Sequence, residues 1–247
     1  MKVGDGIPHA GEKVLAGRVA LVTGGSRGIG LAIARRLGSL GARLAICARH
    51  ADGLDQAAKV LAGEGVATLA VVADVTRADD VASMVAKVET ELGALDILVN
   101  NVGMGIFGPF HERSETEWDT VLDTNLKSVF LVSRTVAPGM IRRRRGNIVN
   151  ISSLAGKNAF SNGGLYCASK WGLMGLTYCM AEELRAHGVR VSVICPGSVA
   201  TDFSPHAGRN PATLLQAEDV AHAVAAMVTE APTSFMSEIN LRPLQKS

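Results

Sequence analysis

The chain has 247 residues, of which 47% are hydrophobic and 19% are charged. This composition supplies a well-buried core and excludes an intrinsically disordered protein, and the length suits one α/β domain or two small ones. Lysine and arginine number 25 and aspartate and glutamate 23, so the net charge of +2 gives no indication of nucleic-acid or membrane-surface binding.

The cysteines and the N-terminal segment indicate where such a protein works. None of the four cysteines, Cys47, Cys167, Cys179 and Cys195, has the spacing of a metal site. We therefore expect reduced thiols, no metal and a cytoplasmic location. Residues 1–16 lack the apolar stretch of a signal peptide, and we expect a flexible tail there, followed by a single domain over residues 17–247. Without a run of about 18 apolar residues, we expect no membrane span.

Short apolar runs alternate along the chain with segments of helical periodicity. The runs predict strands at residues 18–24, 43–49, 66–75, 95–103, 146–153, 189–197 and 237–242. The periodic segments predict helices within 24–42, 52–63, 77–92, 114–137, 164–187 and 217–229, with a loop at 198–215. This alternation predicts an α/β protein with one doubly wound Rossmann domain. Its seven-stranded, mostly parallel sheet has helices on both faces.

The first predicted strand runs into a glycine turn and then a helix. Gly24, Gly28 and Gly30 follow the spacing Gly-xxx-Gly-x-Gly. Glycines let the backbone approach a pyrophosphate, and a helix N-terminus offers free N–H groups and a positive dipole end. The turn therefore predicts a dinucleotide site, and a tight turn without a ligand is the alternative.

Two arginines indicate which dinucleotide binds. An NAD site needs a carboxylate at the end of the second strand, whereas that strand ends here at Arg49. Arg27, inside the glycine turn, supplies a second guanidinium. Two arginines suit a 2′-phosphate, so we predict NADPH over NADH. The alternative role for Arg49 is an exposed charge at a strand end.

Polar residues also end the third and fourth predicted strands. Asp74 can bind an adenine amino group or cap the following helix. Asn100, Asn101, Val102 and Gly103 form a turn just outside the fourth strand. Ligands bind at this carboxyl edge in such sheets, where the strand order reverses. We therefore expect both segments to contact the cofactor.

Tyr166 and Lys170 are four positions apart, and they lie on one face of a predicted helix. Ser153 stands at the end of the preceding strand. An ammonium favours phenolate and makes a phenol a better proton donor, so the three groups together could catalyse a proton transfer. Taken alone, the Tyr/Lys pair is also compatible with an ordinary helix surface.

The chain has one run of like charges, from Arg142 to Arg145. It falls where a predicted helix gives way to a strand. We expect a solvated surface loop there, without a role in nucleic-acid binding.

These motifs, taken in order, resemble the short-chain dehydrogenase/reductase family, and the resemblance extends from about Leu15 to Arg242. Its bacterial 3-oxoacyl-acyl-carrier-protein reductase-like members are the most similar in pattern. The matching motifs are Thr23-Gly24-xxx-Gly28-Ile29-Gly30, Asp74, Asn100-Asn101-x-Gly103, Asn125, Ser153, Tyr166-x-Ala168-Ser169-Lys170, and Pro196-Gly197 followed by Thr201.

The resemblance implies a catalytic tetrad. Tyr166 would give the proton in reduction, and Ser153 would hydrogen-bond the substrate carbonyl. Lys170 would bind the nicotinamide ribose and lower the Tyr166 pKa. Asn125 would hold a water that links Lys170 to solvent, a role compatible with a polar helix residue that closes a backbone kink.

The resemblance also implies NADPH/NADP+ as cofactor. Thr201 and the Val199 backbone would hold the carboxamide, and Val102 departs from the alanine usual in the family. The cofactor-binding residues that we expect are Gly24, Ser26, Arg27, Gly28, Ile29, Gly30, Arg49, Asp74, Val75, Asn101, Val102, Gly103, Tyr166, Lys170, Pro196, Gly197, Val199 and Thr201.

The function that we predict is NADPH-dependent reduction of a ketone or aldehyde. The alternatives are an alcohol or sugar dehydrogenase working in the oxidative direction and a non-catalytic dinucleotide-binding protein. Besides Ser153 and Tyr166, the substrate should meet mostly apolar walls, including Met104, Leu154, Phe160 and Phe203. An acyl-carrier-protein substrate would need a basic docking patch, for which His206 and Arg209 are the candidates.

The two long predicted helices, 114–137 and 164–187, resemble those that pair across subunits in the family. Their apolar residues outnumber what one buried face requires. We expect a homotetramer or a dimer.

Overall fold

A computed structural model describes residues 13–203 and 210–245 of the chain. These residues contain one seven-stranded sheet in the order β3-β2-β1-β4-β5-β6-β7, and each strand runs parallel to its neighbours. The strands are β1 (Val19–Thr23), β2 (Arg43–Ala48), β3 (Thr68–Val72), β4 (Ile97–Asn100), β5 (Gly146–Ile151), β6 (Val189–Pro196) and β7 (Glu238–Leu241).

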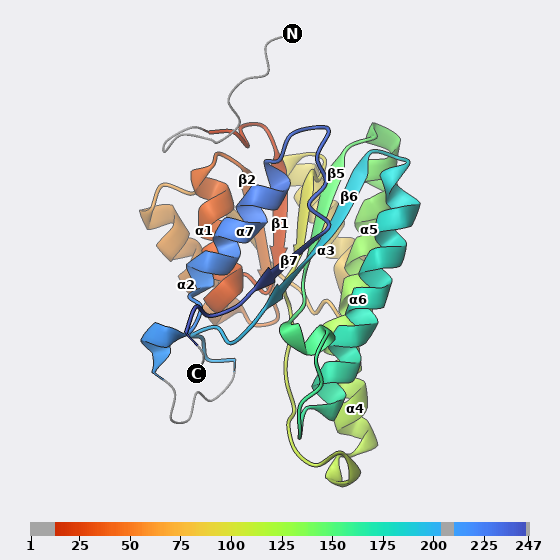
Figure 1. Cartoon of the computed structure of the whole chain (residues 1–247). Helices are drawn as coiled ribbons and strands as arrows, with labels where there is room; N and C mark the ends of the chain where they lie inside the picture. The colour runs from red at the N-terminus through yellow and green to blue at the C-terminus, as the bar shows by residue number, and fades with distance from the viewer. Residues whose placement is uncertain (1–12, 204–209, 246–247) are drawn as a thin grey trace.

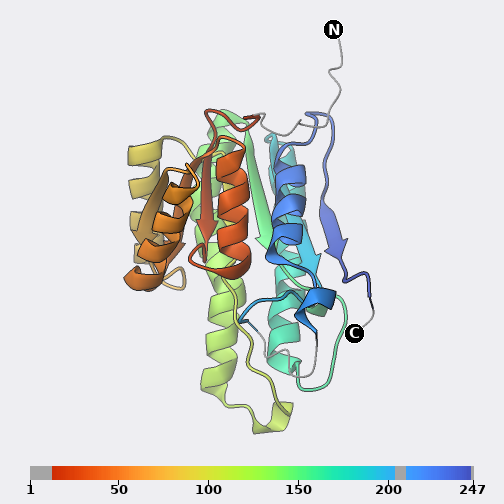
Figure 2. The same cartoon turned by 90° about the vertical axis from the view of Figure 1, so that its left-hand side faces the viewer.

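Helices cover both faces of the sheet, which confirms the predicted doubly wound fold (Figures 1 and 2). One face packs against α1, α2 and α7 in a single apolar cluster, and the other packs against α3, α5 and α6. The helices are α1 (Gly28–Ser39), α2 (Ala51–Gly63), α3 (Ala78–Leu92), α4 (Glu115–Leu122), α5 (Ser128–Arg143), α6 (Gly164–Arg185) and α7 (Ala217–Val228).

The central strands are apolar on both sides because helices cover both faces. In β1, Ala20, Leu21 and Val22 are fully buried. This double burial explains why the strands appear in the sequence as continuous apolar runs rather than as alternating patterns.

The order of strands reverses between β1 and β4, and a crevice forms outside the carboxyl ends of these strands. In Figure 2 the arrowheads point toward the end of the molecule where α4 and the beginning of α6 extend beyond the sheet. The loops after β1, β4, β5 and β6 therefore meet at one edge.

The helix predicted over residues 114–137 has a different course. It begins as expected after Ser114, whose hydroxyl accepts a hydrogen bond from the Glu117 N–H at 3.1 Å in a capping box. A π-helical segment, Asp123–Lys127, then separates α4 from α5, and α5 continues through Pro138 to Arg143. The predicted end at residue 137 is therefore wrong. Pro138 is tolerated because it lies on the exposed side, where water can reach the carbonyl left without a partner.

Residues 13–16, predicted as the end of the flexible tail, belong to the fold. The Leu15 side chain is buried, and its N–H donates to the Leu40 carbonyl at 2.9 Å. The boundary predicted at residue 16 is therefore too late. The remainder of the predicted tail, residues 1–12, lies outside the described residues.

The arginine run is not a loop throughout, because Arg142 and Arg143 end α5, but Arg142, Arg144 and Arg145 are exposed as expected. Arg143 ends α5 and donates to the Leu95 carbonyl, while Arg145 binds the Asp96 carboxylate at 2.7 Å. The Asp96 side chain is only 5% exposed, and it also accepts from the Val19 N–H at 3.1 Å. These arginines tie the helices to the amino edge of the sheet, opposite the crevice.

Within the described ranges, none of the helices has the length and apolar character required to cross a membrane. The same residues contain no group of three or more His, Cys, Asp or Glu side chains suited to a metal ion.

Candidate active site

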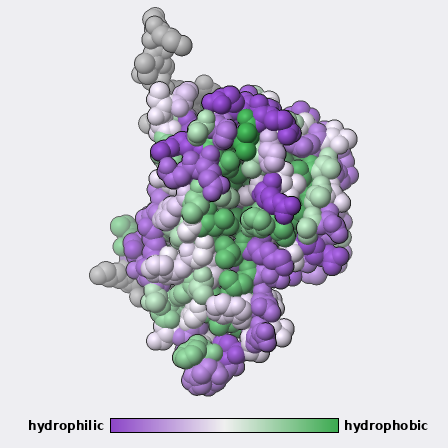
Figure 3. Space-filling view, turned by 90° about the vertical axis from the view of Figure 1, so that its right-hand side faces the viewer, coloured by the Kyte–Doolittle hydropathy of each residue, from purple (hydrophilic) through white to green (hydrophobic). Residues whose placement is uncertain are grey.

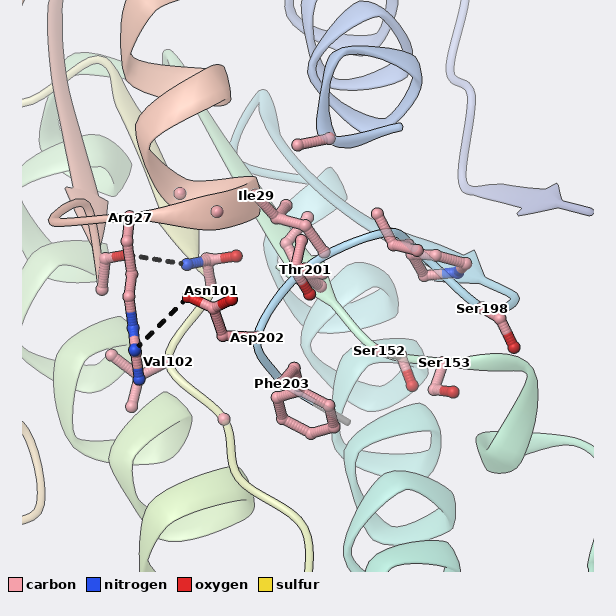
Figure 4. Close-up of a pocket in the computed structure, with 18 of the residues that line it drawn as sticks. Arg27, Ile29, Asn101, Val102, Ser152, Ser153, Ser198, Thr201, Asp202 and Phe203 are labelled. Carbon is pink, nitrogen blue, oxygen red and sulfur yellow. Dashed lines mark hydrogen bonds and ion pairs between the residues drawn. The ribbon is translucent and has the colours of Figure 1, made fainter. Parts of the chain in front are cut away.

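A cleft of about 2040 Å³ opens at the carboxyl edge of the sheet (Figure 4). Every residue expected to hold the cofactor lies in its lining, from Gly24 in the glycine turn to Thr201 after β6. Ser153, Leu154 and Phe160 also line it, from the segment between β5 and α6. The fold therefore brings segments far apart in the sequence to one site.

The glycine turn needs glycine for two separate reasons. Gly24 and Gly28 have φ angles of +65° and +53°, in the left-handed region where other residues are strained. A side chain at Gly30 would collide with the Gly24 carbonyl oxygen, so only glycine lets α1 start so close to β1. Gly28 and Ile29, in the first turn of α1, line the cleft and offer N–H groups to an anion there.

The Asn turn after β4 is bonded to the glycine turn. The Asn101 amide donates to the carbonyl oxygens of Thr23 and Gly24, at 3.1 Å each. The Thr23 hydroxyl in turn accepts from the Asn101 N–H at 3.0 Å. Thr23 was part of the family motif but not of the predicted site, and its role is to fix the two turns relative to each other. Val102 is half-buried and packs on the core beneath.

Asp74 and Arg49 lie near each other at the adenosine end of the cleft. The Asp74 carboxylate accepts from the Thr76 N–H at 3.0 Å and from the Thr76 hydroxyl at 2.8 Å. Burial raises the Asp74 pKa, but these hydrogen bonds and the charges of Arg49 and Arg77 outweigh it, so the pKa is lowered overall. The carboxylate is thus ionised and can accept a hydrogen bond from an adenine amino group.

Arg27 and Asp202 face each other across the cleft. The guanidinium of Arg27, which belongs to the glycine turn, lies 3.8 Å from the carboxylate of Asp202, on the loop that follows β6 (Figure 4). Both side chains are largely exposed, so an incoming phosphate can compete with the carboxylate for the guanidinium. No motif in the sequence indicates this pair, because the two residues are far apart along the chain.

Ser153 and Tyr166 both line the cleft. The Ser153 hydroxyl accepts from the Ala155 N–H at 3.1 Å and caps a short 3₁₀ turn, Leu154–Gly156, which leaves its proton free to be donated. Tyr166 lies in the first turn of α6 and is buried. Burial raises the Tyr166 pKa to about 12, although a hydrogen bond with Ser153 lowers it in part.

Lys170 lies one turn after Tyr166, as the spacing predicted. Its ammonium group donates to the Ile151 carbonyl at 3.0 Å and lies 5.8 Å from the centre of the Tyr166 ring. Burial lowers the Lys170 pKa to about 8. The expected lowering of the Tyr166 pKa by Lys170 is not found, because desolvation of the buried phenol dominates and raises this pKa.

Asn125 lies behind the lining rather than in it, at the centre of the π-helical segment. Its amide donates to the Met104 carbonyl and to the Ser169 hydroxyl, at 2.8 and 2.9 Å, and its oxygen accepts from the Met104 N–H. A π-helical turn has a wider spacing than an α-helical turn, and here it directs the fully buried side-chain amide of Asn125 toward the loop after β4. Met104, predicted to contact the substrate, likewise lies outside the described lining and holds Asn125 through its backbone.

Phe203, predicted to contact the substrate, lines the cleft, and so does Phe107. The ring of Phe107 lies 5.6 Å from that of Tyr166, and the ring of Phe203 lies 5.8 Å from it on another loop. Residues 242–245, after β7, also line the cleft, and no motif had indicated them. His206 and Arg209, the candidates for a docking patch, lie outside the described residues.

Comparison with known proteins places this geometry in context. A family model described as short chain dehydrogenase matches residues 18–212. The 3-oxoacyl-[acyl-carrier-protein] reductase of Staphylococcus epidermidis is 38% identical over 188 residues, which cover 75% of this chain and 76% of that protein.

Solved structures are similar over nearly the whole chain. A metagenomic short-chain oxidoreductase in complex with NADP is 44% identical, with a TM-score of 0.83, over 94% of this chain and all of that one. A variant of actinorhodin polyketide ketoreductase with NADPH is 34% identical, with a TM-score of 0.86, over 92% of this chain and 96% of the other.

Proposed function

Because this chain belongs to the short-chain dehydrogenase family, we propose that it is an NADPH-dependent carbonyl reductase that transfers hydride to a ketone or aldehyde. Membership makes it an oxidoreductase of CH–OH and C=O groups. The observation that carries the finer proposal is the presence of Ser153, Tyr166 and Lys170 in one cleft with the glycine turn and its arginines.

The donor set of the cleft fits NADPH. The glycine turn and the first N–H groups of α1 suit a pyrophosphate, and glycine at position 30 keeps the start of α1 close to this turn, because a side chain there would collide with the Gly24 carbonyl. Arg27 and Arg49 suit a 2′-phosphate, which guanidinium groups bind with paired hydrogen bonds. Similar proteins solved with NADP or NADPH support this choice. When bound, the reduced nicotinamide supplies the hydride.

The residues of the chain handle the proton. The Ser153 hydroxyl donates to the carbonyl oxygen and holds it near the Tyr166 phenol. A Tyr166 pKa of about 12 keeps this phenol protonated at neutral pH, so it is a donor rather than a base. As negative charge develops on the substrate oxygen, Tyr166 transfers its proton, and the Lys170 ammonium stabilises the phenolate that remains.

We retain for Asn125 the role of holding a water that connects Lys170 to solvent. A Cβ placed on Gly103 would lie 3.5 Å from the Asn125 oxygen and 3.6 Å from the Lys170 nitrogen. The space above Gly103 is thus suited to a molecule that touches both groups. Glycine at this position leaves that space open.

The proposal is tested with a panel of carbonyl compounds and NADPH, read from the absorbance of the reduced nicotinamide. We expect turnover with ketones or aldehydes and a higher kcat/KM for NADPH than for NADH. The same panel of alcohols with NADP+ measures the oxidative alternative. Equal use of NADH would reject the cofactor assignment, and binding without turnover in either direction would indicate a dinucleotide-binding protein.

The carrier-protein activity is a narrower form of the proposal. The similarity to a 3-oxoacyl-[acyl-carrier-protein] reductase supports including 3-oxoacyl thioesters in the panel, both free and carrier-linked. A carrier-dependent gain in kcat/KM would support a docking patch near the cleft.

The described cysteines form no disulfide, which supports the proposed cytoplasmic location.

We propose that the outer faces of α4, α5 and α6 pair with a second copy of the chain. Figure 3 shows hydrophobic residues gathered in a band over the side formed by α5 and α6. Large side chains exposed on these helices are Trp118, Phe130, Trp171 and Tyr178. Exposed apolar surface of this extent is typical of interaction sites. Light scattering tests the expected dimer or tetramer, and a monomer would reject it.

A further inference from the structure

Aromatic side chains are rare in this chain but concentrated at one end of the cleft. Phenylalanine, tryptophan and tyrosine make up only 4% of the residues, and phenylalanine occurs six times. Three of these six, Phe107, Phe160 and Phe203, line the cleft together with Tyr166. They come from three different loops, so no local sequence pattern accounts for their meeting.

The rings surround the phenol that we propose as proton donor. Phe107 meets the Tyr166 ring edge-on at 5.6 Å and 63°, and Phe203 is tilted against it at 5.8 Å and 52°. Phe160 is tilted against Phe107 at 6.1 Å. In Figure 4 the Phe203 ring projects from the loop that follows β6, beneath Thr201 and Asp202. We call Phe107, Phe160 and Phe203 the phenyl wall.

The backbone around two of these rings is built to receive them. A Cβ on Gly105 would lie 2.5 Å from the Phe107 ring, and a Cβ on Gly163 would lie 2.5 Å from the Phe160 ring. The outer end of each ring therefore lies where a side chain at the neighbouring glycine would be. The Gly108 N–H donates to the Asn162 carbonyl at 2.9 Å, which ties together the two loops that carry them.

The phenyl wall leaves much of its surface uncovered. Phe107, Phe160 and Phe203 are 38%, 50% and 45% exposed, although rings of this size usually gain stability by burial. Asp202, the charged neighbour of Phe203, faces Arg27 instead. The wall thus presents open, apolar ring faces and edges beside Ser153 and Tyr166, where a carbonyl would be reduced.

We propose that the substrate carries an aromatic ring close to its reducible carbonyl. This inference rests on the proposed carbonyl reductase function and names its substrate class. An aryl group gains from the apolar surface of the wall and also from edge-to-face contacts, which a saturated ring of the same size cannot make. A sugar or a short hydroxy acid would leave its hydroxyl or carboxylate groups against phenyl rings without partners.

The experiment compares phenylacetone with cyclohexylacetone under NADPH saturation. The two ketones have the same carbon skeleton, and neither carbonyl is conjugated, so their intrinsic reactivity is similar. We expect the wild-type enzyme to prefer phenylacetone in kcat/KM. Phe160→Leu and Phe203→Leu keep the wall apolar but remove the ring, and each should reduce the preference by roughly two- to tenfold, mainly through KM.

Phe110→Leu is the matched control, because Phe110 is exposed and lies outside the described lining of the cleft. It should leave the preference unchanged. A wild-type enzyme that reduces cyclohexylacetone as well as or better than phenylacetone would overturn the inference while leaving the reductase function intact. A preference for phenylacetone that persists in both Phe160→Leu and Phe203→Leu would also overturn the inference. Failure to reduce any carbonyl would overturn the proposed function and this inference together. If a wall variant does not fold, as judged by circular dichroism, the wild-type ratio alone decides.

Discussion

Lys170 should make the protein more stable as the pH rises from about 8 to 10.5, the interval between its pKa in the fold and its ordinary pKa. Burial is the cause of this lowered pKa. Between the two values the unfolded chain binds a proton that the folded chain has lost, so raising the pH favours the folded state. Removing the charge by Lys170→Met should abolish this gain.

The magnitude follows from the size of the shift. Each pKa unit corresponds to about 1.4 kcal/mol, so a change from 10.5 to about 8 amounts to roughly 3 kcal/mol in the free energy of unfolding. The contribution is absent below pH 8, grows as the pH rises through that value and is complete above 10.5. A side chain only 4% exposed has little solvent to screen this effect.

The assay is urea unfolding of the wild type and of Lys170→Met, followed by circular dichroism at several pH values across this interval. Distant groups that also titrate there, such as Cys47, whose pKa burial raises to about 12, contribute equally to both proteins. Burial raises the Cys195 pKa and the charge of Lys170 lowers it in part, so both proteins carry Cys195→Ser in this assay. The stability of the wild type minus that of the variant should therefore rise by about 3 kcal/mol. If this stability difference stays level or falls as the pH rises, the conclusion that burial lowers the Lys170 pKa is refuted.

Three further predictions concern the proposed chemistry. Tyr166→Phe keeps the ring contacts with Phe107 and Phe203 but removes the phenol proton. We expect kcat to fall by about 10²–10⁴ and the NADPH affinity, measured by fluorescence titration, to be retained. Near-normal turnover would reject Tyr166 as the proton donor. Arg49→Ala should raise KM for NADPH roughly tenfold or more, through loss of a charge-assisted contact, without changing KM for NADH; equal effects on both would contradict 2′-phosphate binding. Gly30→Ala should abolish NADPH binding in a protein that still folds, with Gly175→Ala, where a Cβ meets open space, as control; undiminished binding by the Gly30 variant would contradict the cradle.

The elements that determine the fold were predictable because their physics is local. A continuous apolar run that glycine or proline ends, as in Val19–Thr23 or Val189–Pro196, is typical of a strand covered on both faces. The glycine turn was recognisable because left-handed backbone and close approach both require glycine. The relation of Tyr166 to Lys170 follows from helical spacing alone.

Other features depend on contacts that sequence separation hides. The bond from Arg145 to Asp96 was not predicted, because nothing along the chain marks Asp96, 49 positions away, as its partner. The π-helical turn that carries Asn125 has no simple periodicity, and Pro138 appeared to end a helix that continues past it. Leu15 was assigned to the tail because its partner Leu40 lies beyond the whole of α1. Phe160 and Phe203 were predicted as walls of the substrate site, but their meeting with Phe107 beside Tyr166 was not predictable, because the three rings come from three loops.

The loop that follows β6 has a consequence for kinetics. Its three consecutive residues serve different parts of the site: Thr201 lines the cofactor cleft, Asp202 pairs with Arg27, and Phe203 leans on Tyr166. A dinucleotide that takes Arg27 away from Asp202 therefore acts on the same short segment that carries part of the substrate wall. We expect compulsory-order kinetics in which NADPH binds first and the ketone second. With NADPH as the varied substrate, a dead-end analogue of the ketone should then lower the apparent KM and the apparent maximal rate by the same factor.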